Sequence, residues 1–254
     1  MNFEEILVHH LLDHRHQLLF KLGPVDFYWS RHLMYIWIAS AVSILLLGFA
    51  ARGKGRVALM LRHAVEVIVL YLRDEVLHPI FHEHTDFYLP YFLTLFFFIL
   101  IANLIGLVPQ TSAVTANISV TAGLALCTFG LIQFAGAKEQ GPVGYFMHIV
   151  PGGVPWWLWP LLLVIEIGGM IAKCVALCIR LFANIISGHI VALAFISLIF
   201  IFGQMASWLG LVVSPAAVGL ALFVALLDVL VSLIQAYIFT MLTAVFVGGA
   251  VHPH

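Results

Sequence analysis

Residues 161–202, LLLVIEIGGMIAKCVALCIRLFANIISGHIVALAFISLIFIF, form one continuous apolar run. As a helix rising about 1.5 Å per residue, this run would be about 63 Å long, roughly twice the hydrocarbon core of a bilayer. It must therefore tilt steeply or break. Glu166, Lys173 and Arg180 interrupt the run. An ionised side chain at the bilayer centre costs roughly 2.5–3.5 kcal/mol, so three in one helix indicate an ion or substrate path.

The composition of the whole chain agrees with a membrane location. Of its 254 residues, 63% are hydrophobic and 9% are charged, and the formal net charge is -1. This balance predicts an all-α polytopic membrane protein and argues against nucleic acid as a partner. No phosphate-binding loop of the GxxxxGK[ST] type is present, and Cys127, Cys174 and Cys178 lack metal-ligand spacing. We therefore expect no cofactor and no metal site.

Apolar segments long enough to cross a bilayer divide the chain into six parts. These parts are an outer N-terminal segment (1–32), a first transmembrane helix (33–51), a cytoplasmic basic loop with an interfacial helix (52–86), a transmembrane hairpin (87–136), a cytoplasmic loop (137–156) and a long tilted helix pair (157–250). Within the pair, residues 203–215 are predicted to form an outer turn between two long helices that make a hairpin. The expected fold has about five crossings and one interfacial helix.

The orientation follows from the basic residues after the first crossing. Arg52, Lys54, Arg56 and Arg62 form the densest basic cluster of the chain. Short loops rich in Lys and Arg stay in the cytoplasm, so the N-terminus is expected outside and, after five crossings, the C-terminus inside. Residues 64–80 mix acidic and apolar side chains, which is typical of a helix lying in the interface.

Helical periodicity brings the polar residues of the two long helices onto defined faces. At about 100° per residue, Arg180, Asn184 and Ser187 fall on one side together with Glu166 and Lys173. Small residues continue the same i+4 ladder, which lets another helix approach closely. The last helix offers the matching face, formed by Asp228, Ser232 and Gln235. His189 lies about 180° from Arg180 on the wheel and should point toward a different neighbour.

Two motifs on these helices resemble a known family. RLFANIISGH at residues 180–189 and LIQAYIFTMLT at residues 233–243 are similar to subunit a of the F-type ATP synthases. Asn103 in NLIGLVP and the run VTAGLAL at residues 120–126 extend the resemblance, which covers the chain from about residue 87 to its C-terminus.

The resemblance implies a role for each polar residue of the helix pair. Arg180 stands where the family has an essential arginine that faces a ring of c subunits, each with a membrane carboxylate. A fixed cation beside a carboxylate favours its ionised form, so it drives release of the proton and blocks a direct leak. Asn184 and Gln235 match residues that orient this arginine by hydrogen bonds. His189 and Asp228 match a pair that lines an outer half-channel, to which Ser232 is also assigned. Glu166 and Lys173 are candidates for an inner half-channel, because their helix starts on the cytoplasmic side.

The pair His189 and Asp228 departs from many bacterial relatives, which carry an acid at the first position and histidine at the second. The order found here resembles mitochondrial members. Either order keeps one imidazole beside one carboxylate, as a proton relay requires. Which group holds the resting proton stays open, and protons are favoured over sodium by the resemblance alone.

The resemblance implies that the chain is a stator subunit of the ATP synthase membrane motor. Its location would be an energy-transducing membrane, most simply the inner membrane of a bacterium. The expected partners are the ring of c subunits, b-type peripheral stalk subunits, the lipid bilayer and translocated protons. Protons would pass two half-channels and so couple ion flow to ATP synthesis or hydrolysis. No catalytic residue is expected on this chain.

Two other classes of protein compete with this interpretation. A membrane di-iron oxygenase is suggested by the HxxxH spacings His10/His14 and His78/His82, but no HxxHH box completes such a site. A stand-alone proton-coupled transporter would carry similar charges, yet the sequence shows neither an internal repeat nor a pair of broken helices. Solute transport by the isolated chain would favour the transporter.

Overall fold

The structure, a computed structural model, describes residues 17–22, 25–29, 31–108, 111, 113–141, 155–205 and 207–251. Residues 1–16 and 142–154, which hold much of the predicted N-terminal segment and cytoplasmic loop, lie outside the described residues.

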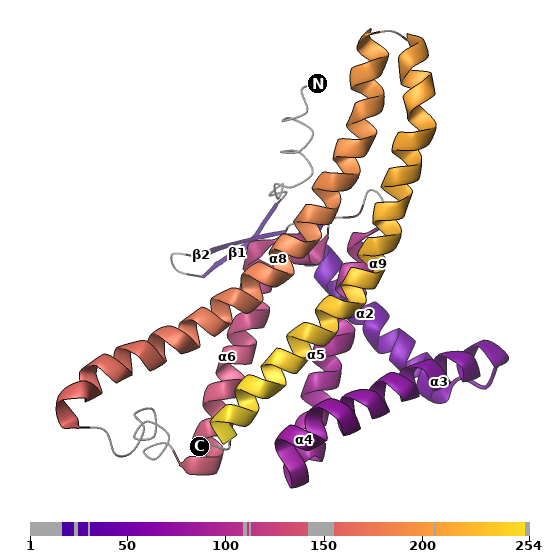
Figure 1. The fold of residues 1–254 in the computed structure, drawn as a ribbon. Coiled ribbons are helices and arrows are strands. Elements are labelled where there is room, and N and C mark those ends of the chain that lie inside the picture. Colours follow the sequence, from indigo (N-terminus) through magenta and orange to yellow (C-terminus); the bar gives the residue numbers. More distant parts are fainter. Residues whose placement is uncertain are drawn as a thin grey trace. The chain divides into compact units, whose positions relative to one another are not determined.

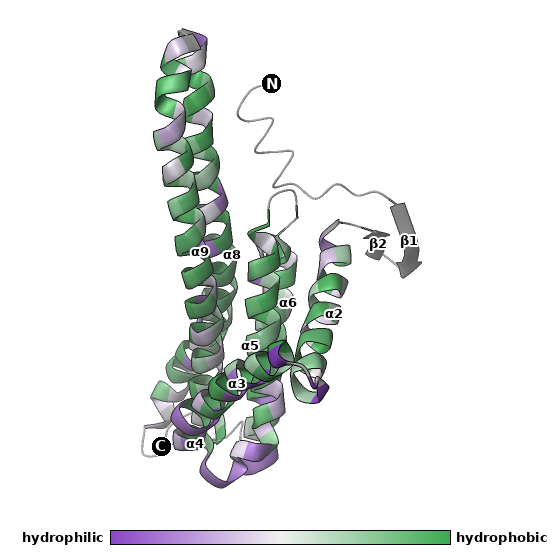
Figure 2. Ribbon diagram, turned by 90° about the vertical axis from the view of Figure 1, so that its right-hand side faces the viewer, coloured by the Kyte–Doolittle hydropathy of each residue, from purple (hydrophilic) through white to green (hydrophobic). Residues whose placement is uncertain are grey.

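Five long apolar helices dominate the described chain. They are α2 (Arg31–Arg52), α5 (Thr85–Gly106), α6 (Ile118–Gln140), α8 (Trp159–Met205) and α9 (Ser207–Val251). Each belongs to one of five helical stretches long and apolar enough to cross a membrane, and Figure 2 shows hydrophobic residues along all five. A helix satisfies its own backbone hydrogen bonds, so such sequences are stable in lipid. The predicted fold class, an all-α polytopic membrane protein, is confirmed.

A small β-hairpin precedes the first crossing. Strands β1 (Gln17–Leu22) and β2 (Val25–Trp29) pair antiparallel, from Gln17 opposite Trp29 to Leu22 opposite Val25. The sequence analysis did not predict this hairpin, although the Gly-Pro dipeptide at residues 23–24 is a turn signal.

A broken helical run connects α2 to α5. It consists of α3 (Arg56–Tyr71), a π-helical segment η1 (Leu72–Leu77), α4 (His78–Phe81) and a 3₁₀ turn η2 (His82–His84). The predicted interfacial segment 64–80 falls within it.

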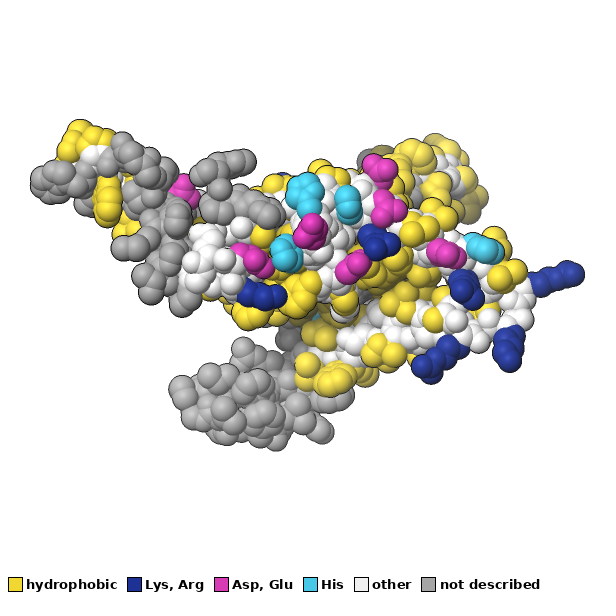
Figure 3. Space-filling view, turned by 90° about the horizontal axis from the view of Figure 1, so that it is seen from below, with side chains coloured by type: hydrophobic (Ala, Val, Ile, Leu, Met, Phe, Trp, Pro, Cys, Tyr) yellow, Lys and Arg dark blue, Asp and Glu magenta, His cyan; other side chains and the backbone are white. Residues whose placement is uncertain are grey.

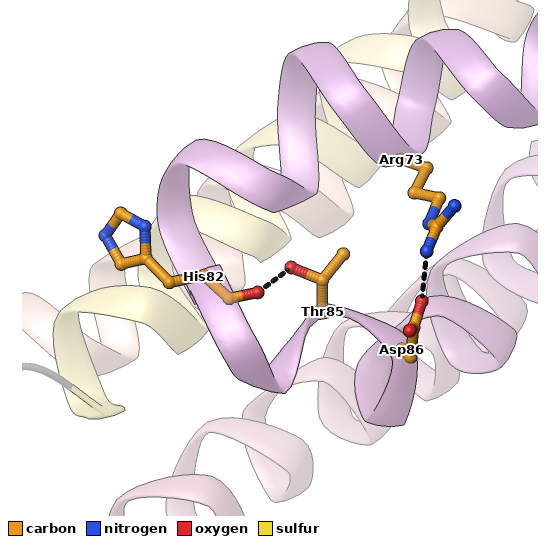
Figure 4. Close-up of polar contacts among 4 residues, drawn as sticks. All are labelled: Arg73, His82, Thr85 and Asp86. Carbon is orange, nitrogen blue, oxygen red and sulfur yellow. Dashed lines mark hydrogen bonds and ion pairs between the residues drawn. The ribbon is translucent and has the colours of Figure 1, made fainter.

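The run ends in a sharp corner at His82, whose φ of 47° is unusual for a residue other than glycine. Two hydrogen bonds lie at this corner, as Figure 4 shows. Thr85 Oγ1 donates to the His82 carbonyl at 2.6 Å, and Arg73 Nη2 donates to Asp86 Oδ1 at 2.9 Å. The 22 residues of α5 after this corner are about 33 Å long, enough to cross a bilayer without the preceding run.

The predicted outer turn at residues 203–215 is wrong. Helix α8 continues to Met205 and α9 already begins at Ser207, so the connection is far shorter. A Cβ on Gly210 would lie 2.9 Å from the Gly203 Cα, so this glycine pair lets the two backbones meet closely beside the connection. Pro215, the last residue of the predicted turn, lies inside α9, and transmembrane helices tolerate such a proline.

The chain divides into two compact units that cut across its helices. Unit 1 comprises Met1–Leu46, Phe97–Asn117 and Leu181–Ala236, and unit 2 comprises Leu47–Phe96, Ile118–Arg180 and Tyr237–His254. Unit 2 has an aromatic core at the start of α5, where the Phe81 ring lies 4.7 Å from that of Tyr88 and 5.6 Å from that of Phe92. In unit 1, Leu181 and Ile185 of α8 are buried.

Candidate functional site

The most specific contact of unit 1 joins α9 to α8. Figure 1 shows the two helices side by side near their connection. A Cβ built on Gly188 would lie 2.5 Å from Asp228 Oδ2 and 2.8 Å from both Oδ1 and Cγ. The carboxyl group therefore rests directly on the α8 backbone, where only glycine leaves room for it. The predicted pairing of the two helix faces is confirmed at this point.

An imidazole lies beside this carboxyl group. His189, the residue after Gly188, interacts electrostatically with Asp228, and both side chains are partly buried. The structure thus brings together one acid and one imidazole from neighbouring helices. Such a pair can pass a proton, because histidine titrates near neutral pH. The prediction that His189 points toward a different neighbour is wrong, because both His189 and the Arg180 face of α8 lie toward α9.

Two further polar side chains of α9 point into the same unit. Ser232 is 1% exposed and Gln235 is 5% exposed. Within the described part of the chain, Ser232 Oγ and Gln235 Nε2 have no hydrogen-bond partner. A buried polar atom without a partner costs about 1–3 kcal/mol, and ordered water commonly satisfies such atoms. These positions suit a hydrated path better than a dry helix interface.

Asn103 is a further buried polar residue of unit 1. Its side chain is fully buried, and Thr115 Oγ1 donates a hydrogen bond to Asn103 Oδ1 at 2.8 Å. Asn103 Nδ2 has no partner among the residues described. The sequence analysis singled out Asn103 but missed Thr115. The available signal was a threonine in the turn-rich stretch QTSAVTAN, whose side-chain direction only the fold reveals.

Asn184, the other residue predicted to support Arg180, is partly buried in α8. Its carbonyl oxygen accepts a hydrogen bond of 2.9 Å from Ser187 Oγ. Ser187 therefore bonds to its own helix, a common arrangement for serine in apolar helices.

The three charged residues of α8 lie in unit 2, and all three are exposed. Lys173 Nζ lies 5.2 Å from the centre of the Phe246 ring of α9, within cation–π range. Glu166 and Arg180 form no ion pair with any described residue. Arg180 thus presents a fixed positive charge near the middle of a 47-residue apolar helix, without a carboxylate from the described chain.

The structure describes one of the two histidine pairs whose spacing suggests a di-iron site. His78 and His82 are exposed, with ring centroids 6.4 Å apart. Among the described residues, no three His, Cys, Asp or Glu side chains are grouped so that they could hold a metal ion. His10 and His14 lie outside the described residues.

Comparison with known proteins gives consistent matches. The sequence profile of the family described as ATP synthase A chain matches residues 33–248. The chain is 41% identical over 236 residues to ATP synthase subunit a of Anaeromyxobacter sp. (strain Fw109-5), a match that covers 91% of this chain and 56% of the relative. It is 38% identical over 240 residues to ATP synthase subunit a of Myxococcus xanthus, covering 91% of this chain and 77% of that protein. The corresponding protein of Chloroherpeton thalassium is 35% identical over 259 residues, covering 96% and 76%. The chain therefore spans little more than half the Anaeromyxobacter relative and about three quarters of the other two.

Proposed function

Because this chain belongs to the ATP synthase A chain family, we propose that it is the stator of the ATP synthase membrane motor. In this role it forms two proton half-channels against a rotating ring of c subunits. Proton flow through the half-channels is thereby coupled to ATP synthesis or hydrolysis at catalytic sites on other subunits.

The observation that carries the proposal is the exposed Arg180 in the middle of α8. A charge at this depth in an apolar helix needs a compensating partner, and none is provided within the described chain. A carboxylate on each c subunit supplies that partner in turn. The fixed cation favours the ionised form of the carboxylate that faces it, so the proton is released there.

The buried polar groups of unit 1 support an outer half-channel. Protons enter past Asp228 and His189, with Ser232 beside them on α9. These groups combine one acid, one imidazole and buried hydroxyl and amide atoms in an otherwise apolar unit.

The other assignments are proposed from the sequence alone. Glu166 and Lys173 line the inner half-channel, and Asn184 and Gln235 orient Arg180. Asn184 lies one helical turn after Arg180 on α8, where i and i+4 side chains are neighbours.

The surroundings of the chain follow from the same role. Its partners are the ring of c subunits, b-type stalk subunits and the lipid bilayer, and its transported ion is the proton. We place it in an energy-transducing membrane, most simply a bacterial inner membrane, with the N-terminus outside and the C-terminus in the cytoplasm. The basic residues after α2 support this orientation.

The test replaces, and then exchanges, the acid and the imidazole of the proposed proton relay, Asp228 and His189. In the assembled complex, His189→Ala and Asp228→Asn should each slow ATP-driven proton pumping into inverted vesicles. The double exchange His189→Asp with Asp228→His should restore part of the rate, because it keeps one acid beside one imidazole. Pumping at the parental rate by Asp228→Asn would contradict the proposed path. Solute uptake by vesicles that hold this chain alone would indicate a stand-alone transporter instead.

A further inference from the structure

An uncompensated group of cations lies where α2 meets α3. Four of the eleven Lys and Arg residues of the chain lie here, and all four are exposed: Arg52, Lys54, Arg56 and Arg62. No Asp or Glu occurs from residue 27 to residue 65. Within the described residues, none of these four cations forms an ion pair. We call these four residues the basic corner.

The backbone of the basic corner is held in place. Gly53 N donates to the Phe49 carbonyl at 2.8 Å, and Leu59 N donates to the Gly55 carbonyl at 2.9 Å. A Cβ on Gly53 would overlap that of Ala58, which is fully buried. The chain therefore turns tightly from α2 into α3, and the cations extend from a defined corner of unit 2.

The length of α2 sets the depth of the basic corner in a membrane. Its 22 residues are about 33 Å long, close to the thickness of the hydrocarbon core, and Arg52 is its last residue. The corner therefore lies at the level of the lipid headgroups.

Helix α3, which begins at the basic corner, has an exposed apolar stripe. Val57, Met60, Ala64 and Val67 recur at i, i+3, i+7 and i+10, and all four are exposed. Arg62 lies on a different side of the helix, since it is offset from Met60 by about 200°. A helix with an exposed apolar stripe and a basic residue on another side is suited to the membrane interface.

We propose that the basic corner binds the phosphate headgroups of anionic lipids in the leaflet where α2 ends. The stripe on α3 contacts the acyl chains beside it. Both arginine and lysine suit this ligand, because each carries a positive charge that attracts a phosphate near an anionic membrane surface. Figure 3, which views the molecule from below, shows Lys and Arg side chains protruding together at one edge. Most of the acidic and histidine side chains in this view gather away from that edge. The inference does not depend on the proposed stator function.

The expected effect can be scaled from the number of charges. Each Lys or Arg near an anionic membrane surface contributes about 1 kcal/mol, which is about a fivefold change in affinity. Removing two charges should therefore weaken binding about 25-fold. Binding should also weaken with added salt, because exposed charges are screened within about 10 Å at 0.1 M ionic strength.

The experiment titrates the purified full-length chain, in neutral detergent, with phosphatidylglycerol and with phosphatidylcholine. Native mass spectrometry counts the bound lipids. The test variant is Arg52→Gln with Lys54→Gln. The matched control is Arg73→Gln with Lys138→Gln, which removes two charges outside the corner: Arg73 pairs with Asp86, and Lys138 Nζ lies 3.6 Å from the Phe87 ring centre. Arg52→Lys with Arg56→Lys keeps the charge of the corner and shows whether the corner still folds.

We expect the affinity of the test variant for phosphatidylglycerol to fall about 25-fold. The affinities of the other two variants should stay within about twofold of that of the parent. Phosphatidylcholine should bind equally weakly to all. Equal losses in the test and control variants would overturn the proposal, as would parental binding by the test variant. Competition by free glycerol phosphate at the lipid's own concentration would assign the corner to a soluble anion. Loss of lipid binding in the assembled complex would assign it to a protein partner.

Discussion

Replacing Gly188 by alanine should disturb the position of one carboxyl group and little else. The new methyl carbon would lie 2.5–2.8 Å from three atoms of Asp228, and ordinary contact begins at 3.4 Å. The carboxyl group must therefore move by about 0.6–0.9 Å, which forces it out of its rotamer at a cost of about 0.5–1.5 kcal/mol. If proton entry requires the carboxyl group in its present position, this cost slows transport by about 2- to 12-fold.

The assay is ATP-driven proton pumping in inverted membrane vesicles, with each rate divided by the amount of assembled complex. Gly219→Ala is the matched control, because a Cβ at Gly219 of α9 meets no atom within 4 Å. Both variants add one methyl group to a long helix of unit 1. The reasoning is refuted if Gly188→Ala and Gly219→Ala pump equally fast.

Three further predictions concern stability, measured as the free energy of unfolding of the chain in detergent. In a double-mutant cycle, Asn103→Leu and Thr115→Val should show a coupling free energy of about 0.6 kcal/mol, up to about 1.7, because the hydrogen bond between these residues is buried. Additive effects of the two substitutions would show that the two side chains do not interact. Gly210→Ala should destabilise the chain by about 1–3 kcal/mol through overpacking against the α8 backbone, whereas Gly219→Ala should change it little; equal effects would contradict a close approach there. Asp86→Asn should cost less than about 1 kcal/mol, since its ion pair is largely exposed, and a larger loss would show that the pair fixes the corner at His82.

The crossings could be predicted from the sequence because a bilayer imposes a length. An apolar run of about twenty residues must be helical in lipid, and no distant contact is needed to decide this. The turn between α8 and α9 could not be placed in the same way. Gly203 and Pro215 look like helix-ending signals, but in membrane helices glycine also allows close packing and proline is tolerated.

The candidate site was predictable only as far as helix faces go. The i+4 ladder correctly indicated that one small residue of α8, Gly188, faces α9. It did not reveal that the Asp228 carboxyl group rests on Gly188, since that contact depends on the axial offset between two helices. The partner of Asn103 was hidden for a similar reason, because Thr115 lies beyond the end of α5 in a short 3₁₀ segment, η3 (Val114–Ala116).

The central claim is that Arg180 gates protons against a carboxylate of the c ring. The most direct measurement replaces Arg180 by alanine in the assembled complex and records ATP-driven pumping together with passive proton leak after the catalytic sector is removed. The account predicts that pumping is abolished and that the leak rises, because nothing then separates the two half-channels. Coupled pumping that persists in a complex without this arginine would contradict the account.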